Sequence, residues 1–213
     1  MSFELATGAE ARWTNPGGRR AVVCVNGGTA AEVPGTWSAS IEWLVHALAP
    51  RFRELSFLEV RYRVKSWRRL EKCVEDARAA IDATEAGEVA LLGFSMGGAV
   101  SVHVAGESRV STVIALAPWL YDQLDVEPLD GRRFAVLHGS LDRGLPGVPG
   151  VAPELSLRGF ERARARGVDA SRTIIGGAVH PIALRAPWGR PIPMPRAGRW
   201  AELVGEELER FCA

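Results

Sequence analysis

The sequence predicts an α/β protein with a mostly parallel sheet covered by helices on both faces, and three observations lead to this prediction. Short runs of β-type residues alternate with helical patterns over most of the 213 residues. The clearest β-type runs are continuously apolar rather than alternating, as expected of strands buried on both sides. Neither an internal repeat nor an interior linker divides the chain, so we expect residues 1–213 to form one domain.

The expected strands differ in how apolar they are. The most apolar runs are residues 21–25, 89–92, 112–117 and 134–137, and weaker candidates are residues 55–60 and 171–175. Residues 3–7 and 11–14 precede an Asn-Pro-Gly-Gly turn at 15–18, and we expect them to form an antiparallel hairpin at one edge of the sheet.

Helical patterns fill the gaps between these strands. The expected helices are residues 37–48, 70–84, 96–105, 153–166 and 200–211. In residues 70–84 the apolar side chains recur at helical spacing, and the charged side chains lie off that face. The two stretches richest in glycine and proline, residues 144–153 and 187–198, are interpreted as loops near a site.

The composition argues against several classes of function. The formal net charge of +1 provides no overall field to attract nucleic acid or an anionic membrane surface. The three cysteines are far apart and have no metal-ligand spacing, so neither a disulfide framework nor a zinc site is indicated, and we expect no cofactor. The chain starts without a signal-peptide pattern and has no run long enough to span a membrane, so we expect a cytoplasmic protein.

The most informative segment is Val-Ala-Leu-Leu-Gly-Phe-Ser-Met-Gly-Gly-Ala-Val at residues 89–100. It has the pattern of a strand, a Gly-x-Ser-x-Gly turn and a helix, which exposes the hydroxyl of Ser95 on a strained turn. Gly93 and Gly97 leave room for neighbouring backbone. The helix that follows directs its free N–H groups and the positive end of its dipole toward developing negative charge. A plain glycine-rich turn with an idle serine is the alternative.

This segment resembles the nucleophile turn of the α/β-hydrolase fold family, and the resemblance covers most of the chain from Ala21 onward. It implies an α/β-hydrolase fold and a catalytic triad in the chain order Ser, Asp or Glu, His. Asp142 matches the family's His-Gly-x-x-Asp pattern and is predicted to be the acid. His180 follows the expected strand at 171–175 and is predicted to be the base.

The chain has other carboxylates and histidines that could belong to the triad. Asp122 and Asp125 are reserve acids, because some hydrolases place the carboxylate after the preceding strand. His103 lies within the expected helix at 96–105 and is interpreted as a core or surface residue. His138 begins the pattern that ends at Asp142 and is not the triad member, and His46 is excluded because it lies in a helix before the serine. Plain loop roles for Asp142 and His180 are the alternatives.

An acyl transfer also needs N–H donors for the developing oxyanion. One predicted donor is the N–H of Met96, which follows the nucleophile. The resemblance places the second donor at Gly28, in the loop Asn26-Gly27-Gly28 after the strand at 21–25. The family usually has histidine where this chain has Asn26. A plain glycine turn is the alternative reading of this loop.

The expected substrate pocket lies beyond the carboxyl ends of the strands. Four tryptophans fall in or near the loops there, and we expect about two of them to line the pocket: Trp37, Trp67, Trp119 and Trp188. The loop at 61–69 is strongly basic, and a solvated charged loop is favoured over a role in binding an anionic substrate. Residues 118–133 leave room for a short helix but not for a cap domain, so we expect an open site.

Together these features predict a serine hydrolase that cleaves a carboxylic ester or thioester of a small molecule through an acyl-enzyme at Ser95. A small peptidase, a dienelactone-type hydrolase and a perhydrolase would use the same residues and remain open. A non-catalytic small-molecule-binding protein on the same scaffold is the alternative from another class. A Rossmann-like nucleotide-binding protein is set aside, because no Gly-x-Gly-x-x-Gly follows the first expected strand. The sequence does not indicate the oligomeric state.

Overall fold

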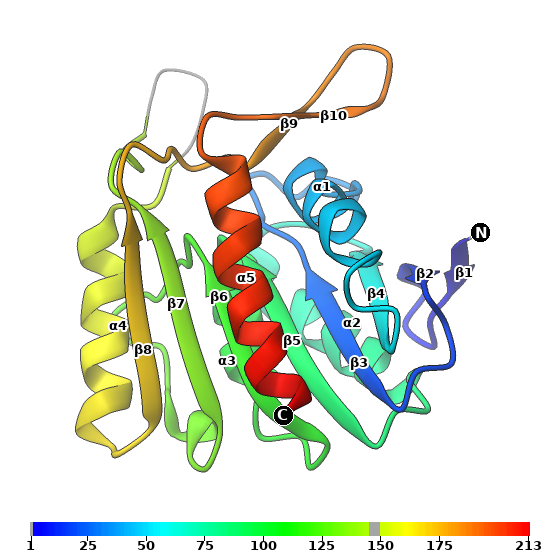
Figure 1. The fold of residues 1–213 in the computed structure, drawn as a ribbon, viewed down its shortest axis with the longest axis horizontal. Coiled ribbons are helices and arrows are strands. Elements are labelled where there is room, and N and C mark those ends of the chain that lie inside the picture. The colour runs from blue at the N-terminus through cyan, green and yellow to red at the C-terminus, as the bar shows by residue number, and fades with distance from the viewer. Residues whose placement is uncertain (1, 145–149) are drawn as a thin grey trace.

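The computed structural model describes residues 2–144 and 150–213. Its strands are β1 (Ser2–Glu4), β2 (Glu10–Thr14), β3 (Arg20–Val25), β4 (Leu55–Arg61), β5 (Glu88–Phe94), β6 (Val110–Leu116), β7 (Arg133–Gly139) and β8 (Asp169–Ile175). They form one eight-stranded sheet in the order β1-β2-β4-β3-β5-β6-β7-β8 (Figure 1). β3 to β8 are parallel, while β1 and β2 form the antiparallel edge that the sequence predicts.

Helices cover both faces of this sheet. They are α1 (Ala39–Leu48), α2 (Leu70–Asp82), α3 (Met96–Val104), α4 (Pro153–Ala165) and α5 (Ala197–Cys212), with short 3-10 turns η1 (Trp67–Arg69) and η2 (Glu127–Leu129). α1 and α5 pack on one face, whereas α2, α3 and α4 pack on the other (Figure 1). α1 begins later than expected because the hydroxyl of Ser38 accepts the N–H of Ile41 at 3.3 Å and caps the helix there.

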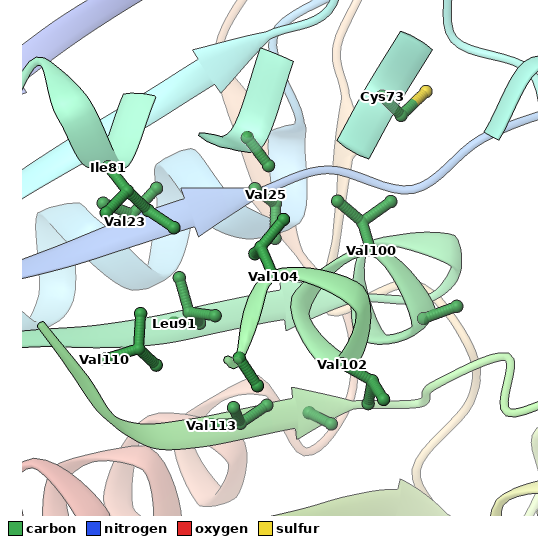
Figure 2. Packing of buried hydrophobic residues seen from close by; sticks show 14 of the residues in the cluster. Val23, Val25, Cys73, Ile81, Leu91, Val100, Val102, Val104, Val110 and Val113 are labelled. Carbon is green, nitrogen blue, oxygen red and sulfur yellow. The ribbon is translucent and has the colours of Figure 1, made fainter. Parts of the chain in front are cut away.

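The continuous apolar runs contribute to two cores, one on each face of the sheet. In β3, Val22 and Cys24 are buried against α1 and α5, whereas Val23 and Val25 are buried against α2 and α3. Alternate residues of one strand therefore enter opposite cores, and no position of the strand can be polar without a partner. Figure 2 shows the second of these cores, where valines of β3, β6 and α3 gather around Leu91 of β5.

Two glycine- and proline-rich stretches, residues 144–153 and 187–198, were expected to be loops, and for residues 187–198 this expectation is partly wrong. Residues 187–198 contain β10 (Pro191–Pro193), which pairs antiparallel with β9 (Ala183–Arg185), and the start of α5. A two-stranded hairpin tolerates proline because both strands are edges. β8 is consequently not the last strand of the chain. Within 144–153, residues 145–149 lie outside the described residues and Pro153 begins α4.

The connection between β6 and β7 leaves the carboxyl edge of the sheet open. Residues 117–132 are all described, and they contain the short turn η2 and no cap domain. Among the helices that the structure describes, none is both long enough and apolar enough to cross a membrane.

Candidate active site

Three loops bring the predicted triad together at the carboxyl edge of the sheet. Ser95 follows β5, Asp142 follows β7 and His180 follows β8, and parallel strands place their carboxyl ends on the same edge. The Nε2 atom of His180 lies 3.0 Å from the Oγ atom of Ser95. The Nδ1 atom of His180 lies 2.7 Å from the Oδ2 atom of Asp142. The side chains form one continuous hydrogen-bonded chain.

The turn at Ser95 holds the serine in a conformation that side chains rarely adopt. Its φ is 56° and its ψ is −118°, and such strain persists only where the surroundings fix it. The N–H of Ser95 donates to the carbonyl of Leu116 at 2.8 Å, and the carbonyl of Ser95 accepts the N–H groups of Gly98 and Trp119 at 3.0 Å each. A Cβ at Gly97 would lie 2.5 Å from the carbonyl oxygen of Val25, so this turn requires glycine.

Asp142 is the most constrained carboxylate of the site. Its side chain is fully buried; Oδ1 accepts the N–H of Val151 at 2.8 Å, and Oδ2 accepts from His180. Oδ2 also lies 3.0 Å from Nε2 of His138. Burial alone raises the pKa of Asp142, but hydrogen bonds from His138 and His180 lower the pKa and outweigh burial, so it lies below its ordinary value. The carboxylate is therefore ionised and orients His180.

His138 provides a second imidazole against Asp142, which the sequence did not predict. The side chain is buried, and its Nε2 lies 2.9 Å from the carbonyl oxygen of Val151 as well as near Asp142. Both neighbours are acceptors, so the proton of a neutral ring is on Nε2. Its Nδ1 has no hydrogen-bond partner among the described residues. The available signal was the i, i+4 spacing within His-Gly-x-x-Asp.

The two predicted oxyanion donors belong to segments next to Ser95. Met96 is the first residue of α3, so its N–H has no acceptor within the helix. In the facing loop, the N–H of Gly27 donates to Oδ1 of Asn26 at 2.7 Å. The N–H of Gly28 engages no acceptor among the described residues. A Cβ at Gly28 would collide with the side chain of Met96, so the two donor segments are in close contact.

Asn26 has a structural role at the position where the resembled family usually has histidine. Its Nδ2 donates to the carbonyl of Thr36 at 2.8 Å, and its own carbonyl accepts the hydroxyl of Tyr62 at 3.1 Å. With the bond to Gly27, these contacts hold the loop in one shape. In this chain the loop is therefore braced by both the side chain and the carbonyl of Asn26.

A pocket of about 180 Å³ opens beside the nucleophile. Its lining includes Ser95 and His180, together with Asn26, Gly27, Gly28, Lys65, Trp67, Phe94, Gly150 and Val151. A larger hollow of about 720 Å³ lies at the amino ends of the strands, lined by residues such as Arg20 and Glu88. It contains no nucleophile paired with a base, so its size does not make it the candidate site.

Only one of the four predicted tryptophans lines the pocket directly, which corrects the expectation of about two. Trp67 lines it, and Trp119 packs behind Trp67 with ring centroids 6.1 Å apart. Trp37 instead packs against the guanidinium of Arg12, 4.4 Å from its ring centroid. Trp188 is 71% exposed in the turn between β9 and β10, a hairpin that the sequence did not reveal.

The reserve residues have other partners. Asp122 accepts from Arg158 at 2.8 Å on the surface, and Asp125 accepts the N–H of Glu127 at 2.9 Å. His103 lies 3.1 Å from the hydroxyl of Tyr121, and Nδ1 of His46 lies 2.9 Å from a carbonyl of its own helix. None of these four residues is hydrogen-bonded to the side chain of Ser95, His180 or Asp142. Within residues 2–144 and 150–213, no three His, Cys, Asp or Glu side chains gather to hold a metal ion.

Comparisons with known proteins agree with this architecture. No protein-family model and no curated protein matches the sequence. Among solved structures, an α/β serine hydrolase homologue from Coxiella burnetii is 19% identical, with a TM-score of 0.69 over 98% of this chain and 96% of its own. An α/β-hydrolase enzyme from a Medee basin deep-sea metagenome library is 16% identical, with a TM-score of 0.71 over 99% of this chain and 97% of its own.

A third similar structure bears on the open edge of the sheet. It is an α/β serine hydrolase without a lid from Xanthomonas campestris, 15% identical, with a TM-score of 0.64 over 84% of each chain. At such identities the likeness establishes architecture. The protein has the α/β-hydrolase fold, and its described residues 117–132 form no cap domain.

Proposed function

We propose that the protein is a serine hydrolase that cleaves a carboxylic ester or thioester of a small substrate through an acyl-enzyme at Ser95, with residues 1–213 acting as one domain. The observation that carries the proposal is the continuous hydrogen-bonded chain from Ser95 through His180 to Asp142. The similar structures include proteins described as serine hydrolases and esterases, which is consistent with this chemistry.

The geometry supports a two-step reaction. Nε2 of His180 accepts the proton of the Ser95 hydroxyl while Oγ attacks the carbonyl carbon of the substrate. The carbonyl electrons move onto the oxygen, which the N–H groups of Met96 and Gly28 stabilise. The electrons of the oxyanion then return, the bond between the carbonyl carbon and the alkoxide or thiolate breaks, and His180 donates its proton to that leaving group, which leaves an acyl group on Ser95. Ionised Asp142 stabilises the imidazolium in between.

Water completes the cycle with the same groups. His180 removes a proton from the water molecule, the hydroxide attacks the acyl carbon, and collapse of the second oxyanion returns the electrons and breaks the bond to Oγ of Ser95. The products are a carboxylic acid and the free serine, whose proton comes from His180. A non-catalytic binding protein is the competing function. A binder has no use for a strained serine held 3.0 Å from an imidazole.

The test is replacement of the nucleophile. Ser95→Ala should abolish labelling by a fluorophosphonate probe and reduce the hydrolysis of 4-nitrophenyl esters by about 10⁴-fold or more, because the acyl-enzyme cannot form. The melting temperature should stay near that of the wild type. Ser111→Ala is the matched control: Ser111 bonds to Glu88 at the amino ends of the strands and should behave as the wild type.

Two results would contradict the proposal. One is stoichiometric labelling of the wild type at a serine other than Ser95. The other is a folded wild type that neither reacts with the probe nor hydrolyses any ester, in which case the binding function would take its place.

A further inference from the structure

The basic loop at 61–69 contains three arginines in ion pairs, one exposed arginine and one lysine. Arg61 pairs with Glu10 at 3.1 Å, Arg63 with Asp76 at 2.7 Å and Arg69 with Glu32 at 3.0 Å. Arg68 is exposed and does not line the pocket. The paired arginines fit the solvated charged loop that the sequence suggested. Lys65 does not fit that description.

Lys65 lines the same pocket as Ser95 and His180. Its side chain is half-buried, and removal from water lowers its pKa. No carboxylate lies within ion-pair distance of its Nζ among the described residues, and residues 145–149 (Leu-Pro-Gly-Val-Pro) contain none. Its only side-chain partner in the described structure is neutral, the hydroxyl of Thr36 at 2.8 Å. A partly desolvated cation that faces a pocket favours an anion from outside.

Backbone contacts hold the segment of Lys65 in place relative to the oxyanion loop. The N–H of Lys65 donates to the carbonyl of Val33 at 2.9 Å, and β-bridges join Pro34 to Val64 and Thr29 to Ser66. The carbonyl of Thr36 accepts from Asn26, which braces the loop of Gly28. The lysine is therefore tied through Thr36 to the segment that positions the reacting carbonyl.

We propose that Lys65 binds a carboxylate of the substrate, so that the preferred substrates are small esters or thioesters that carry one negative charge. This proposal rests on the proposed function. A single ammonium balances a single charge, and an ammonium has three N–H donors, of which the bond to Thr36 uses one. The volume of about 180 Å³ is below the range of roughly 300–1,000 Å³ for sites of drug-sized ligands. The part of the substrate that lies within this pocket is therefore small.

The experiment compares charged esters with their neutral methyl esters. One pair, 4-nitrophenyl hydrogen succinate and its methyl ester, tests a carboxylate on the acyl side. The other pair, 4-acetoxybenzoate and its methyl ester, tests a carboxylate on the leaving-group side. For the wild type, the ratio of kcat/KM for charged over neutral substrate should exceed one in at least one pair. Lys65→Gln should lower that ratio about tenfold or more, the size of a partly desolvated charged hydrogen bond.

Arg68→Gln is the matched control, because it removes the same charge from an exposed position of the same loop and should leave the ratio within about twofold of the wild type. A ratio at or below one in both pairs overturns the proposal. So does a ratio that survives Lys65→Gln or that falls equally in Arg68→Gln. Lys65→Arg keeps the charge and should retain most of the ratio.

If the Lys65→Gln protein does not fold, a second measurement on the wild type tests the proposal. Benzoate should inhibit the wild-type hydrolysis of a neutral ester about tenfold more strongly than its neutral counterpart benzamide, and equal inhibition overturns the proposal. The two proposals fail in different ways. If the protein reacts with the fluorophosphonate probe but does not prefer charged esters, only the proposed carboxylate site is contradicted. If the protein shows neither labelling nor turnover, both the proposed function and the proposed carboxylate site are contradicted.

Discussion

At the scale of single residues, the carboxylate of Asp142 links the most groups in the site. It accepts from the backbone of Val151 and from His180, and it contacts His138. Its pKa is lowered despite burial, so it stays ionised throughout the neutral pH range. Under the proposed function, its charge and its acceptor oxygen fix the tautomer of His180 that leaves Nε2 free to accept the proton of Ser95.

Asp142→Asn should therefore reduce kcat/KM for an ester by about 10⁴-fold, the cost of the comparable change in a serine-protease triad. The amide can donate to Nδ1 of His180 and so favour the wrong tautomer. Steady-state kinetics of the two proteins measure the effect. Asp122→Asn is the control, because Asp122 pairs with Arg158 on the surface. A nearly silent Asp142→Asn together with a severe loss in Asp122→Asn would reverse the assignment.

The residues of the site differ in how well the sequence predicted them. Ser95, Asp142 and His180 each follow a strand, and the motifs that resemble those of the α/β-hydrolase fold family indicated all three. The contact of His138 with Asp142 depends on how the loop after β7 bends back, and the i, i+4 spacing of the two residues was its one sign in the sequence. The position of Lys65 depends on bridges between two loops far apart in sequence, and among several basic neighbours it could not be singled out.

At the scale of elements, α3 depends on glycines for its close approach to β3. Gly97→Ala would place a methyl group 2.5 Å from the carbonyl of Val25. Although alanine favours helices, the collision is with backbone that cannot move aside, and we expect a cost of about 1–3 kcal/mol. Thermal unfolding should show a melting temperature lower by roughly 2–10 °C, and esterase activity should fall because Ser95 shifts.

Gly198 in α5 provides the matched control for this change. A Cβ at Gly198 meets nothing within 4 Å, and the residue has no positive φ. Gly198→Ala should therefore leave the free energy of unfolding unchanged or raise it by up to about 1 kcal/mol, because alanine favours a helix more than glycine does. The melting temperature should stay the same or rise slightly. Equal stability changes in the two variants would show that the close contact of Gly97 has no energetic weight.

The β9–β10 hairpin is the element that sequence patterns missed. Its strands are three residues long, and prolines at both ends of β10 resemble loop composition. The hairpin is recognisable only from its pairing, Ile192 opposite Leu184. Short strands outside the main core have no hydrophobic run to reveal them. The strands of the central sheet were predictable because burial on both faces makes each of them continuously apolar.

At the scale of the whole molecule, a few ion pairs join elements that the sheet itself does not connect. Glu42 of α1 accepts from Arg12 of β2 at 2.9 Å and from Arg185 of β9 at 3.0 Å. The antiparallel edge, a helix of one face and the projecting hairpin thus meet at one carboxylate. Burial alone raises the pKa of Glu42, but the hydrogen bonds and charges of Arg12 and Arg185 lower the pKa and outweigh burial.

This lowered pKa gives the ion pairs a defined dependence on pH. A carboxylate whose pKa is lower in the folded state contributes stability above its unfolded pKa, and that contribution is lost as the pH falls through the folded value. Acidification from about pH 6 to about pH 3.5 should therefore lower the melting temperature, and the fall should be smaller in Glu42→Gln, which cannot be protonated. The difference should be a few degrees, since both arginines remain partly exposed and ion pairs near the surface contribute on the order of 1 kcal/mol.

Glu85→Gln is the control, at an exposed carboxylate with no ion pair in the described structure, and its melting temperature should fall as steeply as that of the wild type. An equally steep fall in Glu42→Gln would show that the three elements are held together without this carboxylate.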